Sequence, residues 1–460
     1  NIAKEFKHSF GRFIAIMAIV ALGVVYGDIG TSPLYTAQTF LAGQGGLGSV
    51  NREAVLGMLS LVFWSITLIT TVKYVLIAMR IDNNGEGGIF ALYSLIRKYG
   101  AWLAIPAMLG GAAFLADSVL TPAVSISSAV EGFQTLPPLE GLFDENPSLT
   151  LMITVVIIVI LFSVQSRGTE SIGKVFGSMV LVWFSFLAIV GVTNLSNDWS
   201  VFAALNPVYG IKFLFSPDNA AGIALMGTVF LSTTGAEALY SDMGHVGRGN
   251  IYFTWPFIKV ALVLNYFGQG AWMLANSDNP QYTAMKSLNP FFQMLPENFR
   301  VFALVLSTFA AIIASQALIT GSFSIVSEAV RLDLMPHMRI NYPSETKGQI
   351  YIPMVNNVML VGCVIVVLLF QNSAHMEAAY GLAITLTMMC TTLLLFFYLH
   401  EERKLKVAPW IFAVFFLLLE GFFFVSSLTK FFHGGYFTIL MAALIMGIMV
   451  CWYNGTAVEQ

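Results

Sequence analysis

An acidic side chain lies within the first long apolar segment of this sequence. Residues 23–35 read GVVYGDIGTSPLY, so Asp28 stands among three glycines, a proline and several hydroxyl groups. Hydrocarbon tolerates neither a lone carboxylate nor a broken helix unless protein or a water-filled cavity surrounds both. A carboxylate beside freed backbone carbonyls and hydroxyls suits a dehydrated cation. The alternative, that glycine and proline are simply common in membrane helices, leaves the buried polar groups without partners.

A second set of polar residues lies in the third apolar segment. Asp117, Thr121 and Ser125 are spaced i, i+4 and i+8, so they share one face of a helix. Pro122 removes a backbone donor and frees the carbonyl of Ser118. This stripe predicts the wall of a cation path. The alternative is a helix contact made by serine and threonine hydroxyls.

The sixth apolar segment contains a further interruption, residues 232–237 with the sequence STTGAE. Segments one and six are five apart, which is the spacing that two five-helix repeats of opposite orientation produce. Such repeats place broken helices opposite each other in the middle of the membrane, where helix ends and unwound carbonyls bind ions. We therefore predict broken helices 1 and 6 that face each other, with Glu237 at the second break.

Later polar positions are weaker candidates. Tyr380 precedes a glycine in the tenth segment, where an aromatic ring is about as often core packing as a ligand. Residues 82–88, DNNGEGG, lack the Gly-Lys-Ser/Thr of a phosphate loop and a preceding strand, so we interpret them as an internal turn or gate. Glu328 and Glu420 are placed near helix ends, where carboxylates reach the interface.

The composition indicates the environment in which these residues act. Of 460 residues, 57% are hydrophobic and 10% are charged, against roughly 25% charged in a soluble domain. The net charge of −3 argues against nucleic-acid binding. The three cysteines lie in apolar stretches without C-x-x-C spacing, which argues against disulfides and a thiolate metal site. No signal peptide is expected, because the first apolar run continues into the acidic break.

About 20 apolar residues cross a bilayer as a helix. On that basis we predict a single all-α transporter domain over residues 1–460 with twelve transmembrane helices. Inverted repeats are expected over about 13–194 and 219–399, followed by two extra helices within 409–453. The predicted segments are 13–40, 54–79, 102–133, 149–164, 173–194, 219–242, 254–275, 300–330, 353–371, 376–399, 409–429 and 434–453.

Basic residues predict the orientation of these segments. With the amino terminus inside, fifteen Lys and Arg residues fall on the inner side and five on the outer side, with two within segments. Such an asymmetry is typical of a cytoplasmic amino terminus. Since the number of segments is even, the carboxyl terminus is also expected in the cytoplasm. We predict a multi-pass protein of the cell (cytoplasmic) membrane.

The sequence closely resembles the KUP/HAK/KT potassium uptake permeases. The resemblance begins in residues 23–35 and continues in the same order through most of the chain. The further matching stretches are 82–88, 120–125, 238–245, 265–270, 348–353 and 378–381.

The resemblance implies a LeuT-like fold of the amino acid/polyamine/organocation superfamily and K⁺ uptake coupled to H⁺ entry. By residue-wise correspondence, six side chains match positions in the K⁺ path: Asp28, Tyr35, Thr121, Ser125, Thr234 and Tyr380. Asp117 and Glu237 match acidic positions implicated in ion binding or proton coupling. Some relatives have Glu at the position of Asp117, so the carboxyl here has a shorter reach.

Members of the family commonly continue into a cytoplasmic domain, which is absent from this chain as given. A homodimer, and regulation through that domain, are expectations from the resemblance. No cofactor and no enzyme activity are expected; K⁺ is the transported ion and H⁺ the coupling ion.

Two other functions remain open at the level of sequence. One is symport of a small organic solute, such as an amino acid, on the same fold. The remote alternative is an intramembrane aspartyl protease that uses Asp28 and Asp117, although the Gly-x-Gly-Asp signature is missing.

Overall fold

The computed structural model describes most of this chain. The described residues are 11, 15, 16, 18, 19, 22–167, 170–285, 288–343 and 350–459, with the backbone alone for 170–174 and 378. Much of the start of the first predicted segment, 13–40, lies outside them, as do Gly348 and Gln349 of the matching stretch 348–353.

The described part of the chain is helical, as predicted, and its β-structure is limited to two isolated bridges, Asn83 with Glu86 and Asn341 with Tyr351. The α-helices are α2 (Gly27–Thr31), α3 (Thr36–Gln44), α4 (Arg52–Ser65), α5 (Ile89–Ile96), α6 (Ala104–Glu131), α7 (Pro137–Glu145), α8 (Leu149–Ser163), α9 (Glu170–Leu195), α10 (Pro207–Leu214), α11 (Ala224–Phe230), α12 (Ala236–Ser241), α13 (Met243–Val246), α14 (Arg248–Asn276), α15 (Pro280–Thr283), α16 (Pro290–Gln293), α17 (Glu297–Arg331), α18 (Pro353–Phe370), α19 (Ser373–Ala379), α20 (Leu382–Phe397), α21 (Ala408–Leu428) and α22 (Gly435–Glu459).

Shorter turns extend or connect these helices. A π-helical stretch, η3 (Ile66–Ile77), continues α4, and a second one, η11 (Tyr398–Glu402), continues α20. The 3₁₀ turns are η1 (Ser32–Leu34), η2 (Leu47–Ser49), η4 (Ala78–Arg80), η5 (Arg97–Tyr99), η6 (Ala101–Leu103), η7 (Gly132–Thr135), η8 (Gln165–Arg167), η9 (Trp199–Leu205), η10 (Leu231–Thr233) and η12 (Phe431–His433).

Ten helical segments among the described residues are long and apolar enough to cross a membrane. They coincide with ten of the twelve predicted segments, often within one to three residues; α18, for example, spans 353–370 against the predicted 353–371. The two remaining predictions, 13–40 and 219–242, fall on interrupted chain. The first contains α2, η1 and α3, and the second contains α11, η10 and α12. These are the two segments for which we predicted breaks.

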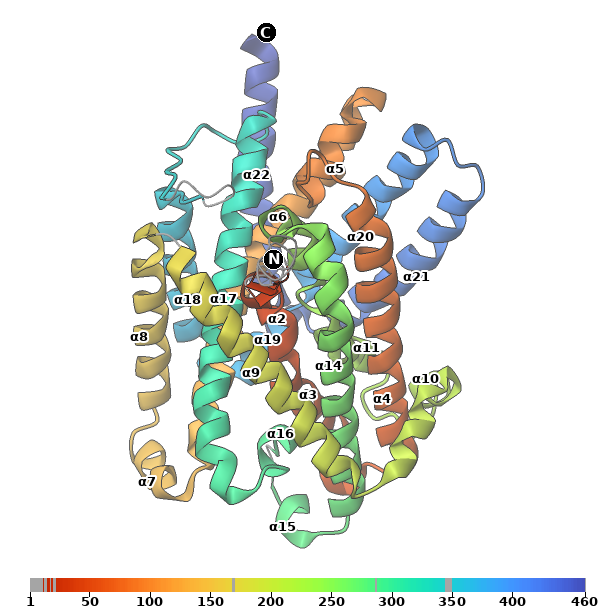
Figure 1. Cartoon of the computed structure of the whole chain (residues 1–460), viewed down its shortest axis with the longest axis vertical. Helices are drawn as coiled ribbons and strands as arrows, with labels where there is room; N and C mark the ends of the chain where they lie inside the picture. The colour runs from red at the N-terminus through yellow and green to blue at the C-terminus, as the bar shows by residue number, and fades with distance from the viewer. Residues whose placement is uncertain are drawn as a thin grey trace, which may run out of the picture.

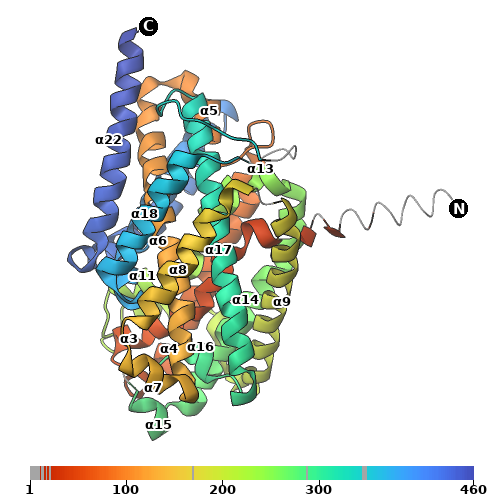
Figure 2. The same ribbon diagram turned by 90° about the vertical axis from the view of Figure 1, so that its left-hand side faces the viewer.

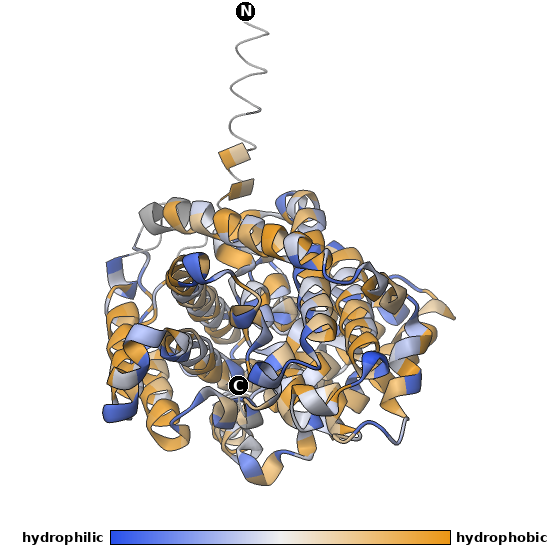
Figure 3. Cartoon of the chain, turned by 90° about the horizontal axis from the view of Figure 1, so that it is seen from below, coloured by the Kyte–Doolittle hydropathy of each residue, from blue (hydrophilic) through white to orange (hydrophobic). Residues whose placement is uncertain are grey.

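The long helices differ in how deeply they are buried. In the apolar 18-residue stretch of the segment that contains α6, 89% is buried inside the protein, whereas only 22% of the corresponding stretch of α22 is buried. The outer helices instead expose large apolar side chains such as Met152, Leu418 and Leu444. Figure 3, a view along the bundle, shows hydrophobic residues on the outer faces of many helices. This distribution is expected when hydrocarbon, rather than water, surrounds the bundle.

The short connecting helices gather at the two ends of the bundle. In Figures 1 and 2, α7 and α15 lie at one end, and α5 and the carboxyl terminus of α22 lie at the other. The interrupted helices α2 and α3 lie between them, and α2 packs against α17. Segments predicted on opposite sides of the membrane therefore lie at opposite ends of the protein.

Candidate functional site

Asp28 lies in α2, a short helix whose five residues are all buried. The carboxylate residue is 2% exposed. Close helix packing holds α2 in place, because a Cβ added to Gly27 would lie 2.7 Å from the Cα atom of Ala314 in α17. The indole of Trp183 in α9 also donates a hydrogen bond to the carbonyl of Gly30, at 2.9 Å.

The first interruption differs in detail from the one we predicted. The chain bends at Tyr26 and tightens into η1 around Pro33. Its freed carbonyls are occupied: those of Gly30, Pro33 and Leu34 accept hydrogen bonds from Trp183, Gln269 and Asn289. Each of these carbonyls therefore already has one hydrogen-bond partner.

The second interruption is a true break between η10 and α12. Thr234 is extended (φ −60°, ψ 139°), and Gly235 adopts φ +97°, a left-handed conformation that glycine reaches without a steric penalty. A Cβ on Gly235 would lie 2.9 Å from the amide nitrogen of Ile29 and 3.1 Å from the Cβ of Asp28. The structure thus brings the two interruptions into direct contact.

Three predicted ligands, Asp28, Tyr380 and Thr121, form a chain of contacts in which the Tyr380 hydroxyl lies between the other two. The Tyr380 hydroxyl donates to Oδ1 of Asp28 at 3.5 Å, and Oγ1 of Thr121 donates to the Tyr380 hydroxyl at 3.5 Å. All three side chains are at least 96% buried. Both contacts are at the long limit of hydrogen bonding, so these oxygens are near one another without being tightly paired.

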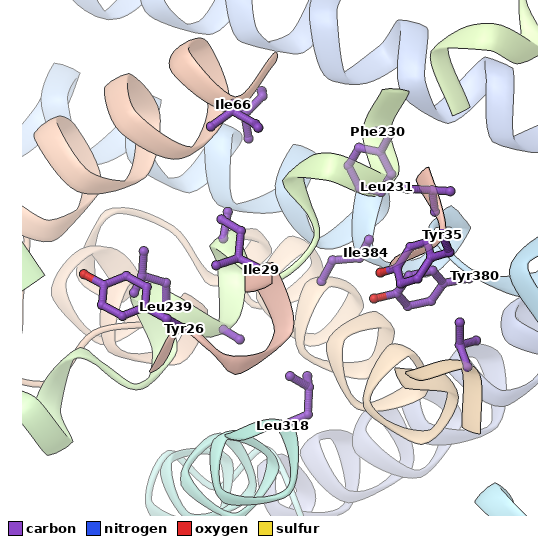
Figure 4. Close-up of a cluster of buried hydrophobic side chains, with 14 of the residues drawn as sticks. Tyr26, Ile29, Tyr35, Ile66, Phe230, Leu231, Leu239, Leu318, Tyr380 and Ile384 are labelled. Atoms are coloured by element: carbon purple, nitrogen blue, oxygen red, sulfur yellow. The ribbon is translucent and has the colours of Figure 1, made fainter. Parts of the chain in front are cut away.

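Tyr35 and Thr234 extend this group of oxygens. Figure 4 shows the rings of Tyr35 and Tyr380 side by side, with both hydroxyls pointing the same way. The Tyr35 hydroxyl is buried and has no hydrogen-bond partner among the described residues, and its polar neighbours are Ser32 and Thr234. Oγ of Ser32 lies 3.4 Å from Oγ1 of Thr234. Ser32 was not among the predicted ligands, although it belongs to the stretch that drew attention to Asp28.

Asp117 and Ser125 lie on α6 with Thr121, as the spacing predicted. Asp117 is 2% exposed, and its Oδ1 has no hydrogen-bond partner within the described chain. Its carboxyl lies within electrostatic reach of Asp28 and Tyr380. Ser125 is buried one turn beyond Thr121, but no described hydrogen bond joins it to the other predicted ligands.

Glu237 lies outside this oxygen group. Its Oε1 accepts a hydrogen bond from Thr391 at 3.0 Å, and its Oε2 accepts one from the Tyr74 hydroxyl. The carboxyl is 1% exposed. The two acidic residues that we assigned to proton coupling are therefore separated: Asp117 faces the Asp28 group, and Glu237 belongs to another polar cluster.

Two positions differ from prediction. Glu420 does not reach the interface: it is fully buried in the middle of α21 and forms an ion pair with Lys73. An intramembrane lysine together with an intramembrane glutamate was the signal for this pair, because charges inside a bilayer are usually paired.

The tenth segment, predicted as one helix over 376–399, is interrupted at Tyr380, which is extended (φ −77°, ψ 142°) between α19 and α20. The interruption is what presents the Tyr380 side chain to Asp28.

A cavity of about 850 Å³ opens at the end of the bundle that carries α7 and α15. Its lining includes Gln38 and Ser128, each one helical turn beyond a predicted ligand, Tyr35 and Ser125. The wall also contains Glu131, which accepts hydrogen bonds from the backbone amide of Ser373 at 2.8 Å and from its hydroxyl at 2.5 Å. This cavity was not among the features predicted from the sequence.

Comparison with known proteins identifies the family. The model described as "K+ potassium transporter integral membrane domain" matches residues 15–457. This chain belongs to that family. The resemblance to potassium uptake permeases is thereby confirmed, and the chain is assigned to a family of integral membrane transporters, not of enzymes.

Named relatives agree with this assignment. A probable potassium transport system protein Kup 2 of Bifidobacterium longum is 79% identical over 444 residues, which are 96% of this chain and 60% of the relative. A probable Kup 1 of Lactococcus lactis subsp. lactis is 52% identical over 451 residues, 98% of this chain and 67% of the relative. The chain thus spans about two thirds or less of the length of these relatives.

A solved structure of a manganese transporter from Eremococcus coleocola aligns with 98% of this chain and 96% of its own, at 14% identity and a TM-score of 0.45. A likeness this distant supports no argument about the fold or the ion of the K⁺ transporter family.

Proposed function

We propose that this protein takes up K⁺ together with H⁺ by alternating access across the cell membrane. The observation that carries the proposal is the Asp28 carboxylate, which is buried in the bundle and faces the Tyr380 hydroxyl, with the Thr121 hydroxyl of α6 on the other side of Tyr380. The relatives are named potassium transport system proteins, which supports K⁺ as the substrate.

The chemistry of the oxygen group suits K⁺. Potassium is large and weakly hydrated, so neutral hydroxyl oxygens can replace its water while one carboxylate balances its charge. Oxygens that share a cation stay farther apart than oxygens that share a proton. The contacts of 3.4–3.5 Å around Asp28, Tyr380 and Thr234 fit that expectation better than closed hydrogen bonds of about 2.7 Å. Asp28, Tyr35, Thr121, Ser125, Thr234 and Tyr380 are the proposed ligands.

The cavity supplies an access route in this proposal. It leads from the α7 and α15 end, which the distribution of basic residues assigns to the outside, towards Tyr35 and Ser125. Carboxylates in its lining, such as Glu131 and Asp144, favour entry of a cation. Both termini lie in the cytoplasm in this orientation.

We further propose twelve transmembrane segments with a LeuT-like arrangement of inverted repeats over about 13–194 and 219–399. The contact between α2 and Gly235 is what such repeats require, since they place their first helices face to face. Segments one, two, six and seven would rock against segments three, four, eight and nine. Dimerisation and regulation by a cytoplasmic domain stay predictions.

We assign proton coupling to two further buried carboxyls, those of Glu237 and Asp117. We propose that Glu237 exchanges the coupling proton and that Asp117, beside the Asp28 carboxylate, responds to occupancy by K⁺. A cation near a carboxyl favours its ionised form, so K⁺ at Asp28 favours the ionised form of Asp117. The test is Glu237→Gln in vesicles: loss of proton-driven accumulation with K⁺ binding retained supports the assignment. Unchanged accumulation would remove Glu237 from this role.

Substrate class is tested by uptake into proteoliposomes that contain the full-length protein. We expect labelled K⁺ to enter and a labelled amino-acid mixture not to enter, because the Asp28 oxygens are spaced for an ion. Amino-acid uptake that Asp28→Asn abolishes would replace K⁺ transport with organic solute symport.

A further inference from the structure

A second buried polar cluster lies beside the proposed K⁺ site and is not used by it. Lys73, in the π-helical stretch η3, is completely buried. Its ammonium donates to the Glu420 carboxylate in α21, to the carbonyl of Met388 in α20 at 2.8 Å and to the Tyr74 hydroxyl at 3.2 Å. All three donor positions of the ammonium are therefore occupied.

The cluster connects Lys73 to Glu237 through one hydroxyl. The Tyr74 hydroxyl accepts the hydrogen bond of Lys73 and donates its own proton to Oε2 of Glu237. On the other side of Lys73, the Thr392 hydroxyl donates to Oε2 of Glu420 at 2.7 Å. A continuous hydrogen-bonded chain thus runs from Glu237 through Tyr74 and Lys73 to Glu420.

Stability alone gives a poor account of this cluster. Two buried charges lose their hydration, and replacing such a pair with apolar side chains is often neutral or stabilising. Charges within a bilayer are costly and are usually retained for function. Local π-helical geometry, which η3 adopts where Lys73 and Tyr74 project, is also frequent at functional positions.

We propose that Lys73 is a positioning residue for proton coupling: it holds the Tyr74 hydroxyl on Glu237 and stabilises the carboxylate that remains after Glu237 releases its proton. Glu420 holds Lys73 in place and balances its charge when Glu237 is protonated. The proton bound to Glu237 moves to water on the inner side, and Lys73 stays protonated throughout. This inference rests on the proposed function, in which Glu237 exchanges the coupling proton.

The charge balance predicts opposite effects for the two members of the ion pair. The titratable groups around Glu237 come from four elements: Lys73 and Tyr74 of η3, Tyr240 of α12, Cys390 of α20 and Glu420 of α21. The phenols and the thiol are neutral near pH 7, so Lys73 and Glu420 are the charges that act on Glu237. Removing Glu420 leaves Lys73 with Glu237 as its only counter-ion. Removing both charges leaves the Glu237 carboxylate without a cation.

The experiment compares pH profiles of K⁺ uptake for the full-length protein, Glu420→Gln and the double variant Lys73→Met/Glu420→Gln. The double variant removes both charges of the pair. Lys73→Met alone would leave the buried Glu420 carboxylate without a cation, which strongly destabilises the fold. Lys259→Met is the matched control, because Lys259 is a half-buried lysine of α14 that lies over the Phe63 ring, away from this cluster. We expect Glu420→Gln to move the midpoint acidic and the double variant to move it alkaline, each by about one pH unit or more.

A second readout follows the carboxyl directly. Infrared titration of the protonated carboxyl band, assigned by its loss in Glu237→Gln, should shift in the same two directions without any transport. Midpoints equal to those of the wild type, or shifts of one sign in both variants, would overturn the role of Lys73. Uptake by the wild type that does not depend on pH would instead refute the proposed H⁺ coupling, so the two failures are distinguishable.

Discussion

The hydroxyls near Asp28 make only long contacts with the carboxylate and with one another. The contacts of 3.5 Å from Tyr380 to Asp28 and from Thr121 to Tyr380 are loose, and the Tyr35 hydroxyl has no partner within the described chain. Buried polar groups normally complete their hydrogen bonds. The incomplete hydrogen bonding near this buried carboxylate therefore favours a bound cation.

Replacing Asp28 with Asn tests that argument. The variant keeps the shape of the side chain but loses the charge that balances K⁺, so the KM for K⁺ should rise about tenfold or more. Asp218→Asn, an exposed aspartate in the described loop after α10, is the control and should leave the KM unchanged. Wild-type KM in Asp28→Asn would refute direct coordination by this carboxylate.

Tyr380→Phe removes only the hydroxyl that lies between Asp28 and Thr121. A single neutral ligand contributes about 1 kcal/mol, so the KM for K⁺ should rise about fivefold while the protein still folds. Tyr436→Phe, at the exposed start of α22, provides the comparison. Equal KM values for both variants and the wild type would mean that Tyr380 packs rather than binds.

Some of these residues could be predicted from the sequence and others could not. Asp28, Thr121 and Tyr380 were identifiable because their types and motifs were visible in the sequence, and the structure brings them together. Lys73 was set aside, and Glu420 was placed at an interface, because each was considered alone. Their significance comes from a contact between residues 347 positions apart, which no local pattern contains.

At the scale of elements, apolar length was a strong predictor. The segments over 149–164 and 409–429 coincide with α8 and α21 because a continuous apolar run leaves the chain no alternative to a helix. The start of α14 was missed by six residues, since polar positions from Arg248 onward continue the helix beyond its apolar part. The interruption at Tyr380 was missed because Gly381 was interpreted as part of a continuous helix, whereas it adopts φ +94°.

Gly235→Ala tests the break in the sixth segment. The left-handed φ of +97° costs a non-glycine residue about 1–2 kcal/mol, and the added methyl group would press on the backbone of Ile29. We expect a lower unfolding temperature and weaker K⁺ binding. Gly447→Ala in α22, where nothing lies within 4 Å of the new methyl group, should be neutral or slightly stabilising. Equal destabilisation of both variants would contradict the special role of this break.

In the whole molecule, the two ends of the bundle differ, and the two interrupted segments touch between them. The cavity lies at the α7 and α15 end, whereas residues 82–88 pack against α12: a Cβ added to Gly87 would clash with the carbonyl oxygen of Tyr240. The β-bridge between Asn83 and Glu86 shows that this segment is a turn, as predicted. Its role as a gate stays a prediction.

A ligand that binds only the folded protein raises its stability by mass action. Purified protein should therefore unfold at a higher temperature in KCl than in NaCl of equal ionic strength, and its free energy of unfolding should be higher by about 2.7 kcal/mol when K⁺ is at 100 times its Kd. The difference should vanish in Asp28→Asn. Equal stabilisation by both salts would indicate a general ionic effect instead of a K⁺ site.

The central claim concerns K⁺ and H⁺ together, so the most direct measurement is K⁺ uptake into proteoliposomes with and without an imposed inward H⁺ gradient, with membrane potential clamped. We predict K⁺ accumulation above equilibrium only when the gradient is present, and its loss in Glu237→Gln. K⁺ entry that stops at equilibrium under both conditions would contradict it.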